Sequence, residues 1–285
     1  MDVSNIDQKL ESILKVNLDT STDDWLHGKL NDIIASNSAK DLYMTYSLLA
    51  GKVDSGKKMQ LDTEDDILKN YLETQNANLL EMARIYLLVA VLEANDDFFG
   101  PKVANLIQVA DTGELVTFLK YLVLLPDAEN YEQTAVEALR TNIASVFEAI
   151  SMKNPYPALY FNDQQWNQMY LKAAFMQLDL SNILDVDKRA NQDLARIISD
   201  YAHERWAASR DIDPLFWRPV SGFLKDNLIN DMERLLQSEN NVENRAGALC
   251  CYFSDNTEAK KLLEKHTDLQ EQVRSNEVTW ANLIK

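Results

Sequence analysis

The spacing of the apolar residues limits the possible folds of this chain more than any other feature of the sequence. Nearly every periodic segment has the repeat of a helix, and none alternates for long as a strand does. Glycine and proline are scarce, with 7 and 6 among 285 residues, few for a fold with many tight turns. We therefore predict an all-α protein, arranged as a helical array or an α-α superhelix. The expected helices are residues 4–16, 23–36, 40–50, 64–75, 77–94, 101–110, 113–124, 129–150, 163–179, 191–209, 220–237, 241–253 and 257–265.

Two segments indicate how these helices pack. The segment "NLLEMARIYLLVAVLE" is apolar on nearly all sides, which is typical of a central helix that neighbours cover. Residues 228–266 read as three helices joined by short polar turns, and the small residues Ala246, Gly247 and Ala248 favour close approach of paired helices. This pattern predicts HEAT-like helix pairs, clearest toward the C-terminus. Asparagine, aspartate and threonine side chains suit helix starts at Thr63, Asp163 and Asn191.

The segment "NPYPALYF", residues 154–161, is the clearest break along the chain. It separates an acidic N-terminal helical region, 1–153, from a C-terminal helical region, 154–285, and we interpret both as parts of one continuous helical domain. The charge differs between the halves: residues 1–150 carry 12 Lys and Arg against 25 Asp and Glu, and residues 151–285 carry 16 against 20. The more balanced second half is the better place for a polar site.

Charge and composition exclude several classes of function. A net charge of −17 disfavours nucleic acid and an anionic membrane surface as partners. The first residues do not indicate a signal peptide, and the longest apolar run, "IYLLVAVL", is too short to span a bilayer, so we expect a cytoplasmic protein without direct membrane insertion. The adjacent Cys250 and Cys251 are expected to be buried reduced thiols. Glycine-rich phosphate loops, the nucleophile-elbow motif and histidine-rich metal motifs are missing, which predicts neither cofactor nor metal.

The stretch "DYAHERWAASR", residues 200–210, has the densest polar chemistry. At 100° per residue, Tyr201 and Arg205 fall on the apolar stripe of the helix, whereas His203 and Trp206 fall on a second face with Ser199 and Asp200. Arg205 in an apolar stripe needs a carboxylate or carbonyl partner, and it either joins two helices or holds an anionic ligand. His203 is either a structural hydrogen-bonding residue or a base oriented by Asp200.

A second candidate helix is "DQQWNQMYLKAAFMQL". Trp166 and Tyr170 belong to its main apolar stripe. On another side lie Gln168, Lys172 and Phe175, with Leu171 close by. Lys172 is either an amine with a lowered pKa or a side chain that reaches solvent. The turn "DPLFWRP" adds Trp217 and Arg218, which either line the mouth of a pocket or cover a helix end. The candidate ligand-binding residues are Trp166, Gln168, Lys172, Tyr201, His203, Arg205, Trp206, Trp217 and Arg218.

The segments "FNDQQWNQMYLKAAF", "NQDLARIISDYAHERWAASR", "LFWRPVSGF" and "MERLLQSENNVENRAGALCCYFS" together resemble the EboA family, over about residues 155–255. The run Tyr201–Ala208 is the most specific part. Ser209 departs from the resemblance, since many relatives are expected to have glycine there.

The resemblance implies a setting and no catalytic residue. EboA proteins resemble products of a bacterial and algal gene cluster for secondary metabolism, with traffic of precursors for pigments such as scytonemin. That cluster also encodes a UbiA-like membrane prenyltransferase and enzyme-like proteins. A small metabolite, or other ebo-cluster proteins including that prenyltransferase, are therefore the implied partners.

Three functions remain open from the sequence. The first is a non-catalytic protein that binds or traffics a small metabolite in a pocket of the C-terminal region. The second is a helical scaffold for protein partners of the same pathway. The third is an enzyme that uses His203 or Lys172, which requires a perturbed pKa in a closed cleft.

Overall fold

The computed structural model describes residues 4–284, and these residues form helices and no strands. The predicted all-α fold is therefore confirmed. The residues group into two compact units, the first ending at Tyr156 and the second beginning at Pro157. The short helix α10 (Tyr156–Tyr160) lies at this junction, within the segment "NPYPALYF". The description of the chain as one continuous domain stays a prediction.

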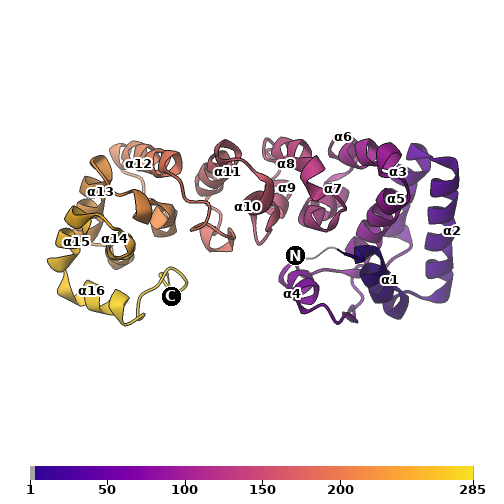
Figure 1. The fold of residues 1–285 in the computed structure, drawn as a ribbon, viewed down its shortest axis with the longest axis horizontal. Helices are drawn as coiled ribbons and strands as arrows, with labels where there is room; N and C mark the ends of the chain where they lie inside the picture. Colours follow the sequence, from indigo (N-terminus) through magenta and orange to yellow (C-terminus); the bar gives the residue numbers. More distant parts are fainter. Residues whose placement is uncertain (1–3, 285) are drawn as a thin grey trace. The chain divides into compact units, whose positions relative to one another are not determined.

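In the first unit, α5 is the central helix (Figure 1), as its apolar composition predicts. Residues 85–89 are all buried, which a helix with a single covered face does not allow. The backbone leaves the helical conformation at Asn95, whose side chain then accepts from the amide of Phe98 and restarts the helix. The helices of this unit are α1 (Ile6–Asn17), α2 (Thr20–Ser36), α3 (Ala39–Leu48), α4 (Asp66–Thr74), α5 (Leu79–Ala104), α6 (Leu106–Val109), α7 (Thr112–Lys120), α8 (Glu132–Ala138) and α9 (Ala144–Ser151), with 3₁₀ turns at Leu49–Gly51, Leu122–Leu124 and Ala128–Tyr131.

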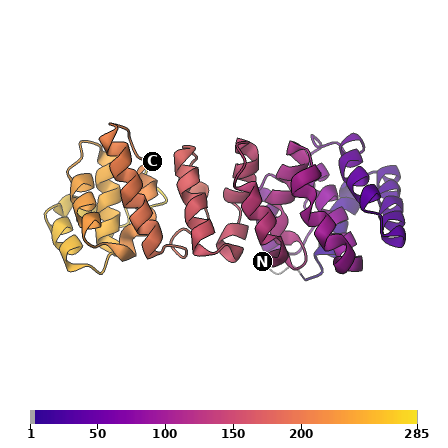
Figure 2. The same ribbon diagram turned by 90° about the horizontal axis from the view of Figure 1, so that it is seen from above.

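In the second unit, helix α12 packs between α11 and α13 (Figure 2). A 3₁₀ helix, η5, follows α12 and packs against both α12 and α14. The helices are α11 (Asp163–Phe175), α12 (Gln192–Ala207), η5 (Pro214–Phe223), α13 (Asn227–Leu236), α14 (Asn241–Phe253), α15 (Thr257–Glu264) and α16 (Thr267–Arg274), with a 3₁₀ turn at Leu180–Asn182.

The contact between α13 and α14 depends on a glycine. A Cβ atom added to Gly247 would lie 2.9 Å from the Cβ of Leu235, closer than such atoms approach in proteins. This confirms the expected role of small residues in pairing these helices; the HEAT-like assignment stays a prediction. Cys250 and Cys251 are buried free thiols, as predicted.

Several expected boundaries are wrong. The expected helix 129–150 is broken by residues 139–143, and the expected helix 220–237 is divided because Asp226 has a positive φ of 46°. Helix α16 was not expected. Asp65 caps α4 in place of Thr63, and Asn162 caps α11 in place of Asp163, whereas Asn191 caps α12 as predicted.

The C-terminal end of α12 has a defined geometry. Ser209 has a φ of 55°, in the left-handed region that favours glycine. The amide of Arg210 donates to the carbonyl of Arg205 at 2.9 Å, and the amide of Ser209 donates to that of Trp206 at 3.0 Å. These two bonds form a Schellman motif, which ends the helix and determines where Arg210 leaves it. Glycine, the residue expected in relatives, is the residue this position favours.

Candidate functional site

A groove runs between α11 and α12, with a volume of about 570 Å³. Helix α11 contributes residues at helical spacing, opposite its buried stripe of Trp166, Met169 and Tyr170. Its lining, which we call the α11–α12 groove, consists of Gln168, Leu171, Lys172, Phe175, Tyr201, Glu204, Arg205 and Arg210. Four of these residues, Gln168, Lys172, Tyr201 and Arg205, are among the candidates from the sequence.

The apolar part of the α11–α12 groove is open to solvent. The ring of Phe175 is 73% exposed, more than any other large apolar side chain among the described residues. Across the groove, the ring of Tyr201 packs edge-on against Phe216, with centroids 5.3 Å apart. Phe216 in turn stacks on Tyr170 at 5.6 Å, so Tyr201 rests on a rigid aromatic base.

Arg205 is fixed by the backbone. Its Nε and an Nη both donate to the carbonyl oxygen of Asp211, at 3.1 and 2.7 Å. This confirms that an arginine in the apolar stripe needs a carbonyl or carboxylate partner. A guanidinium carries five N–H donors, so these two bonds leave further donors at the groove.

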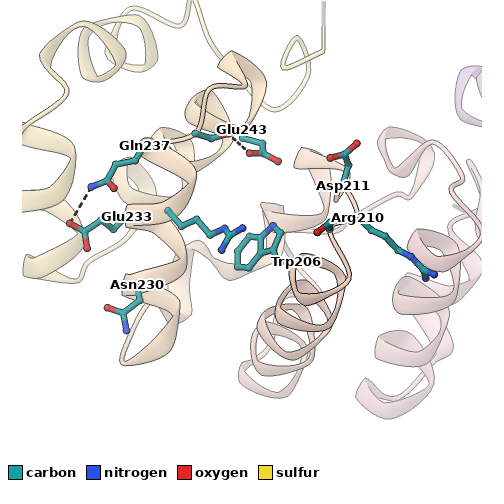
Figure 3. Close-up of a pocket in the computed structure, with 10 residues that line it drawn as sticks. Trp206, Arg210, Asp211, Asn230, Glu233, Gln237 and Glu243 are labelled. Carbon is teal, nitrogen blue, oxygen red and sulfur yellow. Dashed lines mark hydrogen bonds between the residues drawn. The ribbon is translucent and has the colours of Figure 1, made fainter.

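Arg210 lies on the same side of α12 as Arg205. Figure 3 shows its side chain directed away from Trp206 and from the residues of α13. Neither Arg205 nor Arg210 forms an ion pair within residues 4–284, whereas Arg189, Arg196 and Arg218 of the same unit each pair with an aspartate. The two groove arginines therefore keep their charge unneutralised.

Burial lowers the pKa of the Lys172 amine from its ordinary value. The cause is loss of water around the ammonium, and an anion beside it would favour the charged form again. The α11–α12 groove thus combines three basic side chains with the single carboxylate of Glu204. This balance is the opposite of that of the chain, which carries a net charge of −17.

On the other side of α12, a buried carboxylate of α13 bonds to two side chains of the helix. Asp231 of α13 is 2% exposed and accepts two hydrogen bonds of 2.6 Å, from Ser199 Oγ and, in the tautomer that donates, from His203 Nε2. The expected partner of His203, Asp200, instead pairs with Arg196 at 3.0 Å. Ser199, on the same predicted second face as His203, is buried and bonded to α13.

An aromatic stack lies beside this carboxylate, on the α13 side of α12. The guanidinium of Arg234 lies 4.2 Å from the centroid of the Trp206 ring, and Trp206 stacks on Trp217 at 5.7 Å. A polar hollow next to Trp206 is lined by three carboxylates, Asp211, Glu233 and Glu243, by Arg234, and by Arg210, whose side chain points away from it (Figure 3). We call it the α12–α13 hollow; it has no excess of positive charge.

A family comparison matches the chain over residues 6–221 to the family described as metabolite traffic protein EboA. The chain belongs to the EboA family. No curated protein and no solved structure matches it. The EboA match reaches further toward the N-terminus than the resemblance read from residues 155–255, and it ends before the segment "MERLLQSENNVENRAGALCCYFS". Every residue of the α11–α12 groove lies within it, whereas Asp231 and Arg234 lie outside.

The remaining candidate residues of this EboA chain lie away from the α11–α12 groove. Trp166 and Trp217 are each 1% exposed and belong to the core, where Arg189 covers the Trp166 ring at 5.1 Å. Arg218 forms a two-bond ion pair with Asp187, at 2.9 and 2.5 Å. The nine candidates therefore separate into groove, α13-facing and core positions, with Arg218 in a partly exposed ion pair.

Sequence reasoning left out several residues of the groove. Helical spacing puts Phe175 on the same side of α11 as Gln168, with Leu171 close by, and this spacing is the signal that both belong to the groove. Arg210 follows the end of α12, so helical periodicity does not place it. Across residues 4–284, the structure has no helix able to cross a membrane and no group of three or more His, Cys, Asp or Glu side chains that could hold a metal ion.

Proposed function

We propose that this EboA protein binds a small metabolite in the α11–α12 groove. The observation that carries the proposal is an open hollow with an exposed Phe175, a braced Tyr201 ring and converging basic groups. Apolar walls with a few oriented polar groups are typical of small-molecule sites. The volume of about 570 Å³ is within the ordinary range for such sites.

Phe175 supplies the main argument for a bound molecule. Covering an exposed phenylalanine ring removes apolar surface from water, worth about 25 cal/mol per Å². A metabolite lying between Phe175 and Tyr201 would gain this energy while its polar end meets the basic groups. Because the Phe175 side chain is exposed and contributes little to the core, its contact with a ligand can be removed by substitution with little change in the free energy of unfolding.

The family membership supports the wider part of the proposal. We infer that binding serves the traffic of a precursor in a secondary-metabolite pathway, in the cytoplasm. Other ebo-cluster proteins, including a UbiA-like membrane prenyltransferase, are the proposed partners that deliver or receive the molecule. A scaffold role, and an enzyme using His203 or Lys172, stay alternative predictions.

The test is mass spectrometry of small molecules released from protein purified from its native host. Phe175→Ala is the variant, and Phe253→Ala is its matched control, because Phe253 is also an exposed phenylalanine of the second unit, at 58%. We expect wild type and Phe253→Ala to retain the same compound and Phe175→Ala to lose most of it. Circular dichroism checks that all three fold.

Two results would count against the proposal. If no form retains a compound, the scaffold alternative takes precedence, and the search turns to protein partners. Equal retention by Phe175→Ala and wild type would place the compound elsewhere in the protein.

A further inference from the structure

We infer that the ligand of the α11–α12 groove is an organic anion with an apolar, preferably aromatic, body. This inference rests on the proposed function and names the chemical class of the ligand. It follows from the charges around the groove and from how the two arginines are held.

The α11–α12 groove has an excess of positive charge. Three basic side chains, Lys172, Arg205 and Arg210, face a single carboxylate, Glu204. Basic groups gathered on one side of an acidic protein raise the local concentration of anions there. A neutral ligand would gain hydrogen bonds from these groups but not their electrostatic attraction for an anion.

The guanidinium of Arg205 is already oriented before a ligand binds. The carbonyl of Asp211 holds its guanidinium by two hydrogen bonds but leaves its charge unneutralised. A guanidinium that is already oriented loses little conformational freedom when it binds a carboxylate or phosphate through two parallel bonds. The Schellman motif at Ser209 likewise determines where Arg210 begins.

The carboxylates near the groove indicate where the anionic group of the ligand lies. A second hollow of about 810 Å³ shares Tyr201, Arg205 and Arg210 with the groove, but it is also lined by Asp211 and Asp213. Those carboxylates repel an anion. The anionic group therefore belongs in the α11–α12 groove, and any extension of the ligand into the second hollow is uncharged.

The apolar lining of the groove indicates the nature of the rest of the ligand. Leu171, Phe175 and Tyr201 line the same groove as the cations, and they offer apolar and aromatic faces. Aromatic pairs gain about 0.5–1.5 kcal/mol beyond the burial of their area. An aromatic body with one anionic group meets both kinds of lining at once.

The experiment compares three probes with one naphthalene body by isothermal titration calorimetry: 2-naphthoate, 2-naphthyl phosphate and the neutral 2-naphthamide. We expect wild type to bind at least one anion about tenfold more tightly than the amide. The two anions distinguish a carboxylate ligand from a phosphate ligand. The preference should decrease as salt rises, since the site is open to solvent.

The double variant Arg205→Gln, Arg210→Gln should bind all three probes with nearly equal affinity. Arg196→Gln is the matched control, because Arg196 lies on the same helix but pairs with Asp200 outside the groove. It should keep the wild-type preference. Circular dichroism and urea unfolding verify that each variant folds.

The outcomes separate this inference from the proposed function. If all three probes bind equally and Phe175→Ala weakens each, the groove binds ligands and the inference about charge is wrong. An anion preference that survives in the double variant also overturns the inference, because the anion then binds elsewhere. Absence of binding by every probe contradicts the inferred class, while the compound retained from the host decides the proposed function separately.

Discussion

The two sides of α12 use polar residues in opposite ways. Toward α13, the carboxylate of Asp231 is buried and bonded by Ser199 and His203, and Arg234 lies over the ring of the half-buried Trp206. Toward α11, Arg205 and Arg210 keep unneutralised charges beside an exposed Phe175. The polar residues of this one helix therefore do not form one site: those toward α13 bond within the protein, and the α11 side is the one we propose for a ligand.

The largest loss of stability is expected for Asp231→Ala. It removes the buried acceptor and leaves the buried Ser199 hydroxyl without its partner. Hydrogen bonds to charged groups contribute about 1.5–3 kcal/mol each, so we expect a loss of about 3 kcal/mol in the free energy of unfolding. Urea denaturation measures it. A loss below about 0.5 kcal/mol would show that the α13 side is not stabilised by this carboxylate.

Gly247→Ala tests the packed side without changing charge. The added methyl would lie 2.9 Å from Leu235 Cβ, so α13 and α14 must move apart. Overpacking of this kind costs about 1–3 kcal/mol, and we expect about 2 kcal/mol by urea denaturation. Gly28→Ala is the control, because nothing lies within 4 Å of its added Cβ. Equal stability of Gly247→Ala and wild type would contradict the close contact.

Ser209→Gly tests the left-handed backbone conformation at the end of α12. Glycine adopts the left-handed conformation of this residue without the steric cost that serine has. We expect a gain of about 1 kcal/mol in the free energy of unfolding, read from the urea midpoint. Ser275→Gly is the control: Ser275, also just after a helix, has a right-handed backbone, so glycine should not stabilise it. If the two variants behave alike, Ser209 is not strained.

The smallest effect on stability is expected for Phe175→Ala. Because its ring is 73% exposed, truncation should change the free energy of unfolding by less than about 0.5 kcal/mol. The same variant should lose most of the retained compound. Differential scanning calorimetry measures the first effect, and a loss above about 2 kcal/mol would assign Phe175 to the core and not to the groove.

Sequence periodicity predicts much of this second unit. It identifies α11 and α12, the buried stripe of Trp166 and Tyr170, and the shared face of Tyr201 and Arg205, because these depend only on 3.6 residues per turn. It also predicts that Arg205 needs a bonding partner, since an isolated charge among apolar residues is costly.

The pairing across helices could not be predicted in the same way. Asp231 lies 28 residues from His203, and only the packing of α13 on α12 brings them together. From the sequence, the nearer Asp200 is the only carboxylate that helical spacing offers to His203, and the bond of Ser199 to α13 has no sequence signal. Trp217 and Arg218 were grouped with the site because they are aromatic and basic, whereas packing buries the first and Asp187 pairs with the second.

Hydrogen exchange, measured by mass spectrometry with and without saturating 2-naphthoate, tests most directly the claim that ligands bind on the α11 side of α12. We predict slower exchange in residues 168–175 and 204–211, and unchanged exchange in residues 227–236 of α13. Slower exchange confined to residues 227–236 would show that the ligand binds beside Trp206 and Arg234, and it would contradict the division of roles between the two sides of α12.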